Sequence, residues 1–253
     1  MSNAVFWGCL LLSAGPPTVL YCLVIGRKSF LVLLSLASAF FWLVIFLVIA
    51  VICRAVLPLG SAASYVLVSL LSVSIQEAAR YGLWTVHRRC VAALEMIAQK
   101  KADTHLTVQN QQAMALTHGF AHGVVQSVLF NISWLPLSLG DATYYVPACA
   151  SMSYFLVSAL LLLGFFLLHT ASMVVSFEGL AAGHALYIAT PPALHLVTSL
   201  LTVANLAKGG CVVVVPLVLC LGLAMTVVAT WMSRQSASNG YQSVQDLQLP
   251  DDI

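Results

Sequence analysis

Long apolar segments separated by short polar ones constrain the fold of this chain more than any other feature. Each is about as long as the ~20 residues that a helix needs to cross the hydrocarbon core of a bilayer. Membrane β-barrel strands are only about ten residues long, and these runs are too long and unbroken for them. The sequence therefore predicts an all-α, polytopic membrane protein with seven transmembrane helices, at residues 4–25, 30–53, 61–87, 113–135, 147–172, 181–206 and 211–231.

Composition supports a membrane protein and leaves no room for a soluble domain. The chain is 61% hydrophobic and only 7% charged, whereas charged residues make up about a quarter of a soluble domain. The formal net charge of +2 gives no indication of nucleic-acid binding. We expect one transmembrane domain over residues 1–232, followed by a polar, cytoplasmic, disordered tail at residues 233–253.

The distribution of basic residues predicts the orientation. If the N-terminus is lumenal or extracellular, only Arg54 and Lys208 fall on that side. An excess of Lys and Arg marks the cytoplasmic side, so the C-terminus is predicted to be cytoplasmic. The longest loop, residues 88–112, is predicted to begin as an amphipathic extension of the third helix. The cytoplasmic segments then hold the remaining cations: Arg27, Lys28, Arg88, Arg89, Lys100, Lys101 and Arg234.

The seven cysteines are scattered, mostly within apolar runs. None shows paired or C-x-x-C spacing, which favours buried free thiols over a disulfide framework.

Polar residues inside the third segment are candidates for function, because an unsatisfied polar group in hydrocarbon is costly. This segment contains Gln76, Glu77 and Arg80. Glu77 and Arg80 are three residues apart and can pair on one helix face. Two interpretations remain open: an ion pair that fixes helix packing, which we favour, or a catalytic or ion-conducting carboxylate.

The fourth segment has small residues at four-residue spacing, namely Gly119, Gly123 and Ser127. This pattern allows another helix backbone to approach closely, so it predicts a packing face. His118 and His122 in the same segment have a spacing that can bind a metal. No third ligand is evident nearby, so we favour packing or interhelical hydrogen bonding and predict no metal or cofactor.

Two further histidines, His169 and His195, lie in the fifth and sixth segments. Pro191 and Pro192 are predicted to kink the sixth helix just before His195. An imidazole can donate and accept hydrogen bonds, so two histidines with an acidic residue on a third helix predict a shared polar site. None of the aspartates falls within an apolar segment. An aspartyl protease needs two paired carboxylates, so this chain alone is not expected to be one.

Several short motifs together resemble the anterior-pharynx-defective (Aph) family, a seven-helix subunit of gamma-secretase. They occur in the family's order and extend from Ala4 to about Trp231. The third small position departs from the family's pattern, since it holds Ser127 instead of glycine. The motifs are Ala4-Val-Phe-Trp-Gly-Cys9, Gly15-Pro16, Ala39-Phe-Phe-Trp-Leu-Val44, Gln76-Glu77-Ala-Ala-Arg80-Tyr81, Gly119-x-x-x-Gly123, Leu167-Leu-His169-Thr170 and His195-Leu-Val-Thr-Ser199 with Asn205.

The resemblance implies a non-catalytic scaffold that binds presenilin, nicastrin and the presenilin enhancer subunit. It implies a role in complex assembly and protein processing, including the Notch signaling pathway. The implied location is the membranes of the endoplasmic reticulum, Golgi, plasma membrane and endosomes. The family's assembly and activity roles carry over to Gly119, Gly123, Ser127, His169 and His195.

Two other functions share parts of the pattern. Glu77, Arg80, His169 and His195 distantly resemble a glutamate/histidine-dependent intramembrane protease of CAAX type, in which a glutamate and histidines activate water. Such enzymes carry a double glutamate, and Gln76 occupies the first position here. A seven-helix receptor shares the topology, but the sequence shows no obvious lumenal cysteine pair.

Overall fold

The computed structural model describes residues 3–56, 60–102, 106–140, 145–146 and 148–238. About 90% of it is helical, as the apolar segments predict. The long helices are α1 (Asn3–Leu20), α2 (Ser29–Val56), α3 (Ala62–Ala102), α4 (Val108–Ser127), α5 (Tyr154–Ala182), α6 (Ala185–Val203) and α7 (Gly210–Ser238). Short elements extend or connect them: π-helices η1 (Tyr21–Ile25) and η2 (Val128–Ile132), and 3₁₀-helices η3 (Leu135–Leu139) and η4 (Ala204–Leu206).

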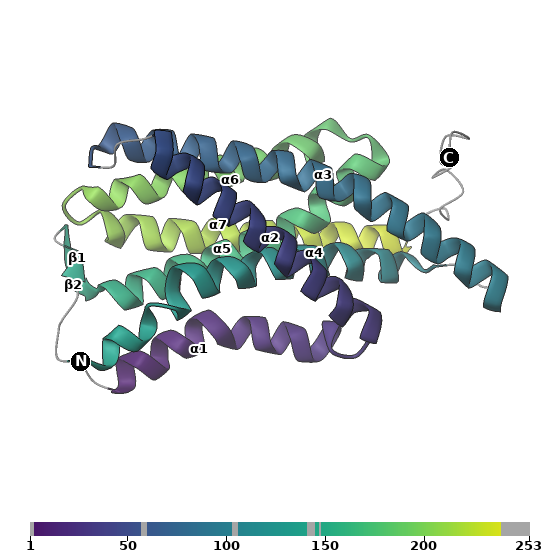
Figure 1. The fold of residues 1–253 in the computed structure, drawn as a ribbon, viewed down its shortest axis with the longest axis horizontal. Helices are drawn as coiled ribbons and strands as arrows, with labels where there is room; N and C mark the ends of the chain where they lie inside the picture. The colour runs from purple at the N-terminus through teal and green to yellow at the C-terminus, as the bar shows by residue number, and fades with distance from the viewer. Residues whose placement is uncertain (1–2, 57–59, 103–105, 141–144, 147, 239–253) are drawn as a thin grey trace.

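The long helices form one bundle and run alternately in opposite directions (Figure 1). The start of α1 lies at one end of the bundle and the end of α7 at the other. Six helices, namely α1, α2, α3, α5, α6 and α7, are long and apolar enough to cross a membrane. The sequence predicted seven spans; α4 does not meet the same criterion, because its glutamine, histidine and threonine side chains lower its hydropathy.

Helix α5 lies at the centre of the bundle. It packs against α1, α4, α6 and α7, and it is buried along most of its length from Phe155 to Gly179. Lipid can also solvate an apolar helix, so the burial of α5 follows from its contacts with these four helices and not from its apolar composition alone. Its central position places His169 in the middle of the protein.

Several boundaries differ from the sequence prediction. Helix α3 does continue past the predicted span, to Ala102. Its 41 residues correspond to about 61 Å, twice the thickness of the hydrocarbon core. Helix α7 continues to Ser238, six residues into the predicted tail, and residues 239–253 lie outside the described residues. Pro191 and Pro192 lie inside α6, which is helical from Ala185 to Val203.

A short hairpin replaces the predicted start of the fifth helix. Strands β1 (Tyr145–Val146) and β2 (Cys149–Ser153) pair in antiparallel orientation, and α5 starts only at Tyr154. The Ser153 side chain then accepts a hydrogen bond from the Leu156 amide and caps α5. The sequence did not indicate this hairpin, because apolar residues continue through it.

A disulfide joins Cys149 on β2 to Cys211 at the start of α7, with Cα atoms 6.1 Å apart. The prediction of free thiols was wrong for these two residues. They are 62 positions apart in the sequence, so only the folded hairpin brings them together. The lack of a cysteine pair is therefore no longer an argument against a seven-helix receptor.

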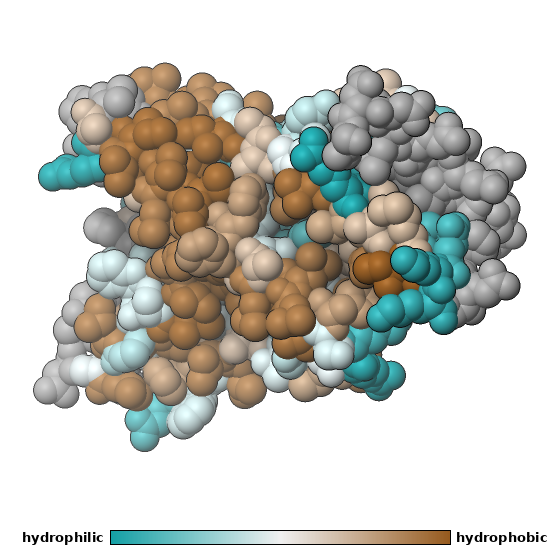
Figure 2. Space-filling view, turned by 45° about the vertical axis from the view of Figure 1, so that its right-hand side comes forward, coloured by the Kyte–Doolittle hydropathy of each residue, from teal (hydrophilic) through white to brown (hydrophobic). Residues whose placement is uncertain are grey.

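The outer surface is largely apolar. Large hydrophobic side chains are exposed on α1 and α2, including Trp7, Leu11, Leu33, Phe40 and Leu47. Figure 2 shows hydrophobic residues over much of one face, with hydrophilic residues gathered toward the end of the molecule that comes forward there. In a soluble protein such a surface would be unusually apolar, whereas lipid chains solvate it well.

The disulfide predicts which thiols react in the denatured chain. Alkylation in denaturant without reductant should modify the five free cysteines, Cys9, Cys22, Cys53, Cys90 and Cys220. Two more sites should react after reduction, measured as a mass shift. Modification of all seven cysteines before reduction would contradict the Cys149–Cys211 bond.

Candidate functional site

Helix α3 places a buried polar stripe against the bundle. Residues Ser69, Val73, Gln76, Arg80 and Leu83 are all buried. Their spacing of three and four residues puts them on one helix face. Two of them, Gln76 and Arg80, carry groups that need polar partners when they are removed from solvent.

Glu77 uses both of its carboxylate oxygens, one for an ion pair within α3 and the other for a bond to α6. Arg80 Nη1 donates to Oε2 at 2.6 Å, and His195 Nδ1 donates to Oε1 at 2.6 Å. The side chain of Arg80 is 3% exposed and that of Glu77 is 17% exposed. The structure thus brings together three of the predicted site residues, and it places the negative charge between a cation and an imidazole donor.

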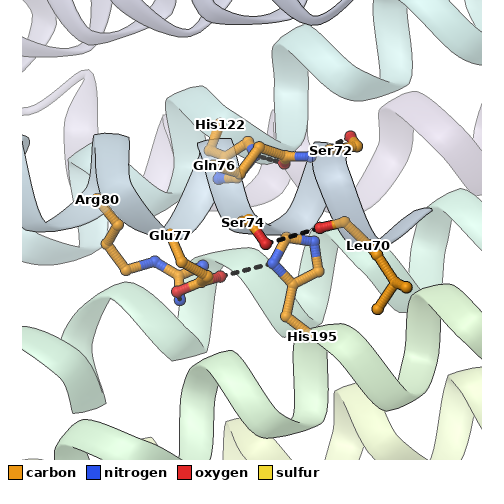
Figure 3. Close-up of polar contacts among 8 residues, drawn as sticks. All are labelled: Leu70, Ser72, Ser74, Gln76, Glu77, Arg80, His122 and His195. Carbon is orange, nitrogen blue, oxygen red and sulfur yellow. Dashed lines mark hydrogen bonds and ion pairs between the residues drawn. The ribbon is translucent and has the colours of Figure 1, made fainter. Parts of the chain in front are cut away.

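Gln76 makes the corresponding connection to α4. Its Oε1 accepts a hydrogen bond from His122 Nε2 at 2.9 Å, and its Nε2 donates to Ser72 Oγ at 3.0 Å. In Figure 3, Gln76 points toward His122 on one side of α3, while Glu77 points toward His195 on the other. Adjacent residues on a helix are about 100° apart, so one dipeptide can bind two different helices.

Aromatic and imidazole rings continue this cluster through the bundle. His122 stacks on Trp42 of α2, with ring centroids 3.7 Å apart. His169 stacks on the other side of the column, 3.9 Å from the ring of His122. His195 then meets His169 edge-on, with centroids 4.7 Å apart and planes at 89°. Four helices, α2, α4, α5 and α6, therefore contribute rings to one column.

His169 differs from the hydrogen-bonding link that the sequence predicted. It is fully buried, and neither ring nitrogen has a hydrogen-bond partner among the described residues. Its contacts are ring contacts, with His122, His195 and Phe165. His122 was not among the predicted cluster residues, although its position four residues from His118 did single it out. We define the polar cluster as Gln76, Glu77, Arg80, His122, His169 and His195.

His118 has a separate environment. Its Nδ1 lies 2.6 Å from Ser38 Oγ on α2, and its ring meets His87 edge-on at 5.4 Å. It therefore does not share a ligand position with His122. In the described part of the chain, no three His, Cys, Asp or Glu side chains are grouped to hold a metal ion.

The small residues of α4 pack against α5 of the same chain. A methyl group on Gly119 would lie 2.7 Å from the carbonyl oxygen of Thr170. One on Gly123 would lie 2.6 Å from Cδ2 of Phe166. Ser127 is also buried. The absence of side chains at the two glycines allows the backbones to approach closely, as in other small-residue membrane contacts.

A second glycine contact joins α5 to α7. A methyl group on Gly164 would lie 2.7 Å from Cγ1 of Val218, and one on Gly222 would lie 2.5 Å from the carbonyl oxygen of Gly164. The sequence gives no signal for this contact, because glycine is common in membrane helices and neither helix has a second glycine at four-residue spacing. Together the two contacts fix α5 between α4 and α7.

These features define a polytopic helical membrane protein with a polar cluster at its centre and close helix contacts at glycine. The Aph-1 protein family matches residues 4–236, and the chain belongs to this family. A gamma-secretase subunit APH1-like protein of Arabidopsis thaliana is 37% identical over 86% of this chain and 88% of its own length. Gamma-secretase subunit APH-1B of Mus musculus is 30% identical over 79% of this chain and 78% of its own. Gamma-secretase subunit Aph-1 of Drosophila melanogaster is 28% identical, with coverages of 81% and 83%.

The contact between α4 and α5 predicts different effects at two glycines. Gly119→Ala should destabilise the chain by about 1–3 kcal/mol, because the methyl group meets backbone carbonyls that cannot move away alone. Gly82→Ala on α3 is the matched control: nothing lies within 4 Å of the added methyl group. It should stabilise the helix by up to about 1 kcal/mol. Thermal unfolding in detergent measures both, and equal melting temperatures for the two variants would contradict this packing.

Proposed function

We propose that this chain is a non-catalytic scaffold subunit of gamma-secretase. In this role it binds nicastrin and presenilin, together with the presenilin enhancer subunit, and supports the processing of membrane protein substrates. The observation that carries the proposal is the Aph-1 family match over residues 4–236, with relatives that are named as gamma-secretase subunits. The chain then resides in the membranes of the endoplasmic reticulum, Golgi, plasma membrane and endosomes.

The geometry of Glu77 supports a structural role for the polar cluster. Both carboxylate oxygens are bound, by Arg80 and by His195. A general base must reach the water or group from which it takes a proton, and here each oxygen already accepts a hydrogen bond from a protein partner. No aspartate falls in an apolar segment that could supply a second carboxylate. The catalytic residues of the complex are therefore assigned to another chain.

The length and packing of α4 support a seventh membrane crossing. Its 20 residues correspond to about 30 Å, the thickness of the hydrocarbon core. It packs against α2 and α5, and its polar side chains His118 and His122 have partners on neighbouring helices. A helix shielded from lipid in this way can cross the membrane with a lower hydropathy than its neighbours.

The disulfide supports the orientation predicted from the basic residues. Disulfides form in oxidising compartments such as the lumen of the endoplasmic reticulum. Cys149 and Cys211 lie at the end of the bundle where α1 starts, with the hairpin. A lumenal N-terminus therefore agrees with both the disulfide and the basic residues at the opposite end.

The proposed topology is tested by single-cysteine labelling in a cysteine-depleted chain. Cysteines placed at Asn3 and Ser238 should react from opposite sides of sealed membranes, because seven crossings separate them. Labelling of both from the same side would overturn the seven-span topology.

The scaffold function is tested at His195. His195→Asn keeps an N–H close to the position of Nδ1 and should preserve the bond to Glu77, whereas His195→Ala leaves the carboxylate short of a donor, at about 1–3 kcal/mol. The asparagine variant should co-purify presenilin and nicastrin and support substrate cleavage, and the alanine variant should lose much of both. The measurement is cleavage per assembled complex after purification in mild detergent.

An amide cannot exchange a proton near neutral pH, so the same assay separates scaffold from enzyme. His169→Gln serves as a second amide variant. Normal assembly with abolished cleavage in both His195→Asn and His169→Gln would refute the scaffold and favour the glutamate/histidine protease of CAAX type. Failure to co-purify presenilin or nicastrin with the unmodified chain would refute membership of the complex.

A further inference from the structure

Helix α3 continues past the ends of the other helices, at the end of the bundle opposite the hairpin (Figure 1). Its residues from Arg89 to Ala102 are not needed to cross the membrane, because the whole helix is about twice as long as the hydrocarbon core is thick. Most of the basic residues of the chain lie at this end. The last turns of α3 therefore lie beyond the hydrocarbon core, in water.

One face of this extension combines positive charge with apolar side chains. Arg89, Ala93, Met96 and Lys100 are all exposed, and their spacing of four, three and four residues places them on one side of the helix. Met96 is 60% exposed, and its neighbour Ile97 is 53% exposed. Large apolar side chains gain free energy when a partner removes them from water. We call these five residues the α3 docking face.

The positive charge of the docking face is not neutralised within the described residues. Neither Arg89 nor Lys100 has an ion-pair partner there, and Lys101 lies next to them as a third exposed cation. The acidic residue of the extension, Glu95, is only 6% exposed and accepts a hydrogen bond from the Leu106 amide at 2.7 Å. It therefore points away from the docking face, which is complementary to an acidic segment with apolar side chains.

The segment that follows α7 has this composition. Residues 239–253 lie outside the described residues, so only their sequence enters here. The segment contains three negative charges and no Lys or Arg, with apolar residues before and between the charges: Val244, Asp246, Leu247, Leu249, Asp251 and Asp252.

The end of α7 brings this segment within reach of the docking face. Gln235 and Ser236, near the end of α7, border the same cavity as Val91 of α3. Met96 is five residues further along α3, which corresponds to about 8 Å. The six residues from Ser238 to Val244 can span about 20 Å. This length is enough to pass around α3 to its exposed side.

An anionic membrane surface also has the right charge, but the length of the docking face argues against it. Lys100 is eleven residues beyond Arg89, about 16 Å along the helix. Attraction to a charged leaflet falls off within a Debye length, about 8 Å at physiological ionic strength. A leaflet that reached Arg89 would leave Lys100 and Met96 in water, whereas a segment of the chain can cover the whole face.

We propose that residues 239–253 of this chain bind the α3 docking face. The aspartates of the segment pair with the basic side chains, and its apolar residues cover Met96 and Ile97. Because the segment is attached to α7, its effective concentration at the face is about millimolar, so individually weak contacts suffice. The contact ties the ends of α3 and α7 together beyond the membrane.

Cross-linking in the full-length chain, within its co-purified complex, tests the proposal. The five free cysteines are replaced by alanine, and the Cys149–Cys211 disulfide is kept. A short bis-maleimide should join Met96→Cys to Val244→Cys within one chain, as measured by mass spectrometry of proteolytic fragments. Labelling with a monofunctional maleimide corrects for the reactivity of each position.

The matched control pairs Ala98→Cys with Val244→Cys. Ala98 is two residues from Met96 but about 200° around the helix, so it lies on the other side of α3 and should cross-link several-fold less. Equal yields for the two pairs, or a cross-link from Met96→Cys to another subunit in place of Val244→Cys, would overturn the proposal.

Charge reversal separates docking from the random encounters of an attached segment. Lys100→Glu combined with Lys101→Glu should lower the yield of the cross-link about fivefold, as the loss of two or three exposed ion pairs implies. Changing the three aspartates of the segment to lysine in the same chain should restore the yield. Arg54→Glu, at the opposite end of the bundle on α2, should leave it unchanged. A yield that is insensitive to the reversal, or that does not return in the chain with both sets of changes, would contradict docking.

Discussion

In a bilayer there is no water to satisfy a polar group, so each one that a helix carries inward must find its partner in protein. Helix α3 meets this constraint with one dipeptide. Gln76 binds His122 on α4, and Glu77 binds His195 on α6. These bonds fix both the rotation and the height of α3, because a turn of the helix or a shift along its axis would separate the partners. The column of rings from Trp42 to His195 forms around the same contacts.

The glycine contacts solve a different problem, which is attraction between helices in a solvent as apolar as they are. Lipid chains provide no hydrophobic driving force for this association, so close van der Waals packing must supply much of it. Gly119 and Gly123 bring α4 onto α5, and Gly164 and Gly222 bring α7 onto its other side. Close packing then holds the His169 side chain in its buried position on α5, because neither of its ring nitrogens has a hydrogen-bond partner among the described residues.

The helical fold and most of the cluster could be predicted from the sequence, because polar residues in long apolar runs are few and expensive. Glu77, Arg80 and His195 were expected together for this reason, and the structure brings them together. The stacking role of His169 could not be predicted, since ring geometry depends on the crossing of four helices. The hairpin and the Cys149–Cys211 bond were missed because apolar composition does not distinguish a short strand from a helix, and 62 intervening residues conceal the pairing. The low hydropathy of α4 is compatible with its place in the bundle, because neighbouring helices shield its polar side chains.

The disulfide also bears on the order in which the chain is made. Cys149 precedes α5, and Cys211 follows α6, so the segment between the two cysteines is a complete helical hairpin. The two thiols reach the same side of the membrane only after α5 has crossed and α6 has returned. A chain in which only one of the two helices inserted would hold its cysteines on opposite sides and could not close the bond. Formation of this covalent link therefore excludes a chain in which one of the two helices has been integrated without the other.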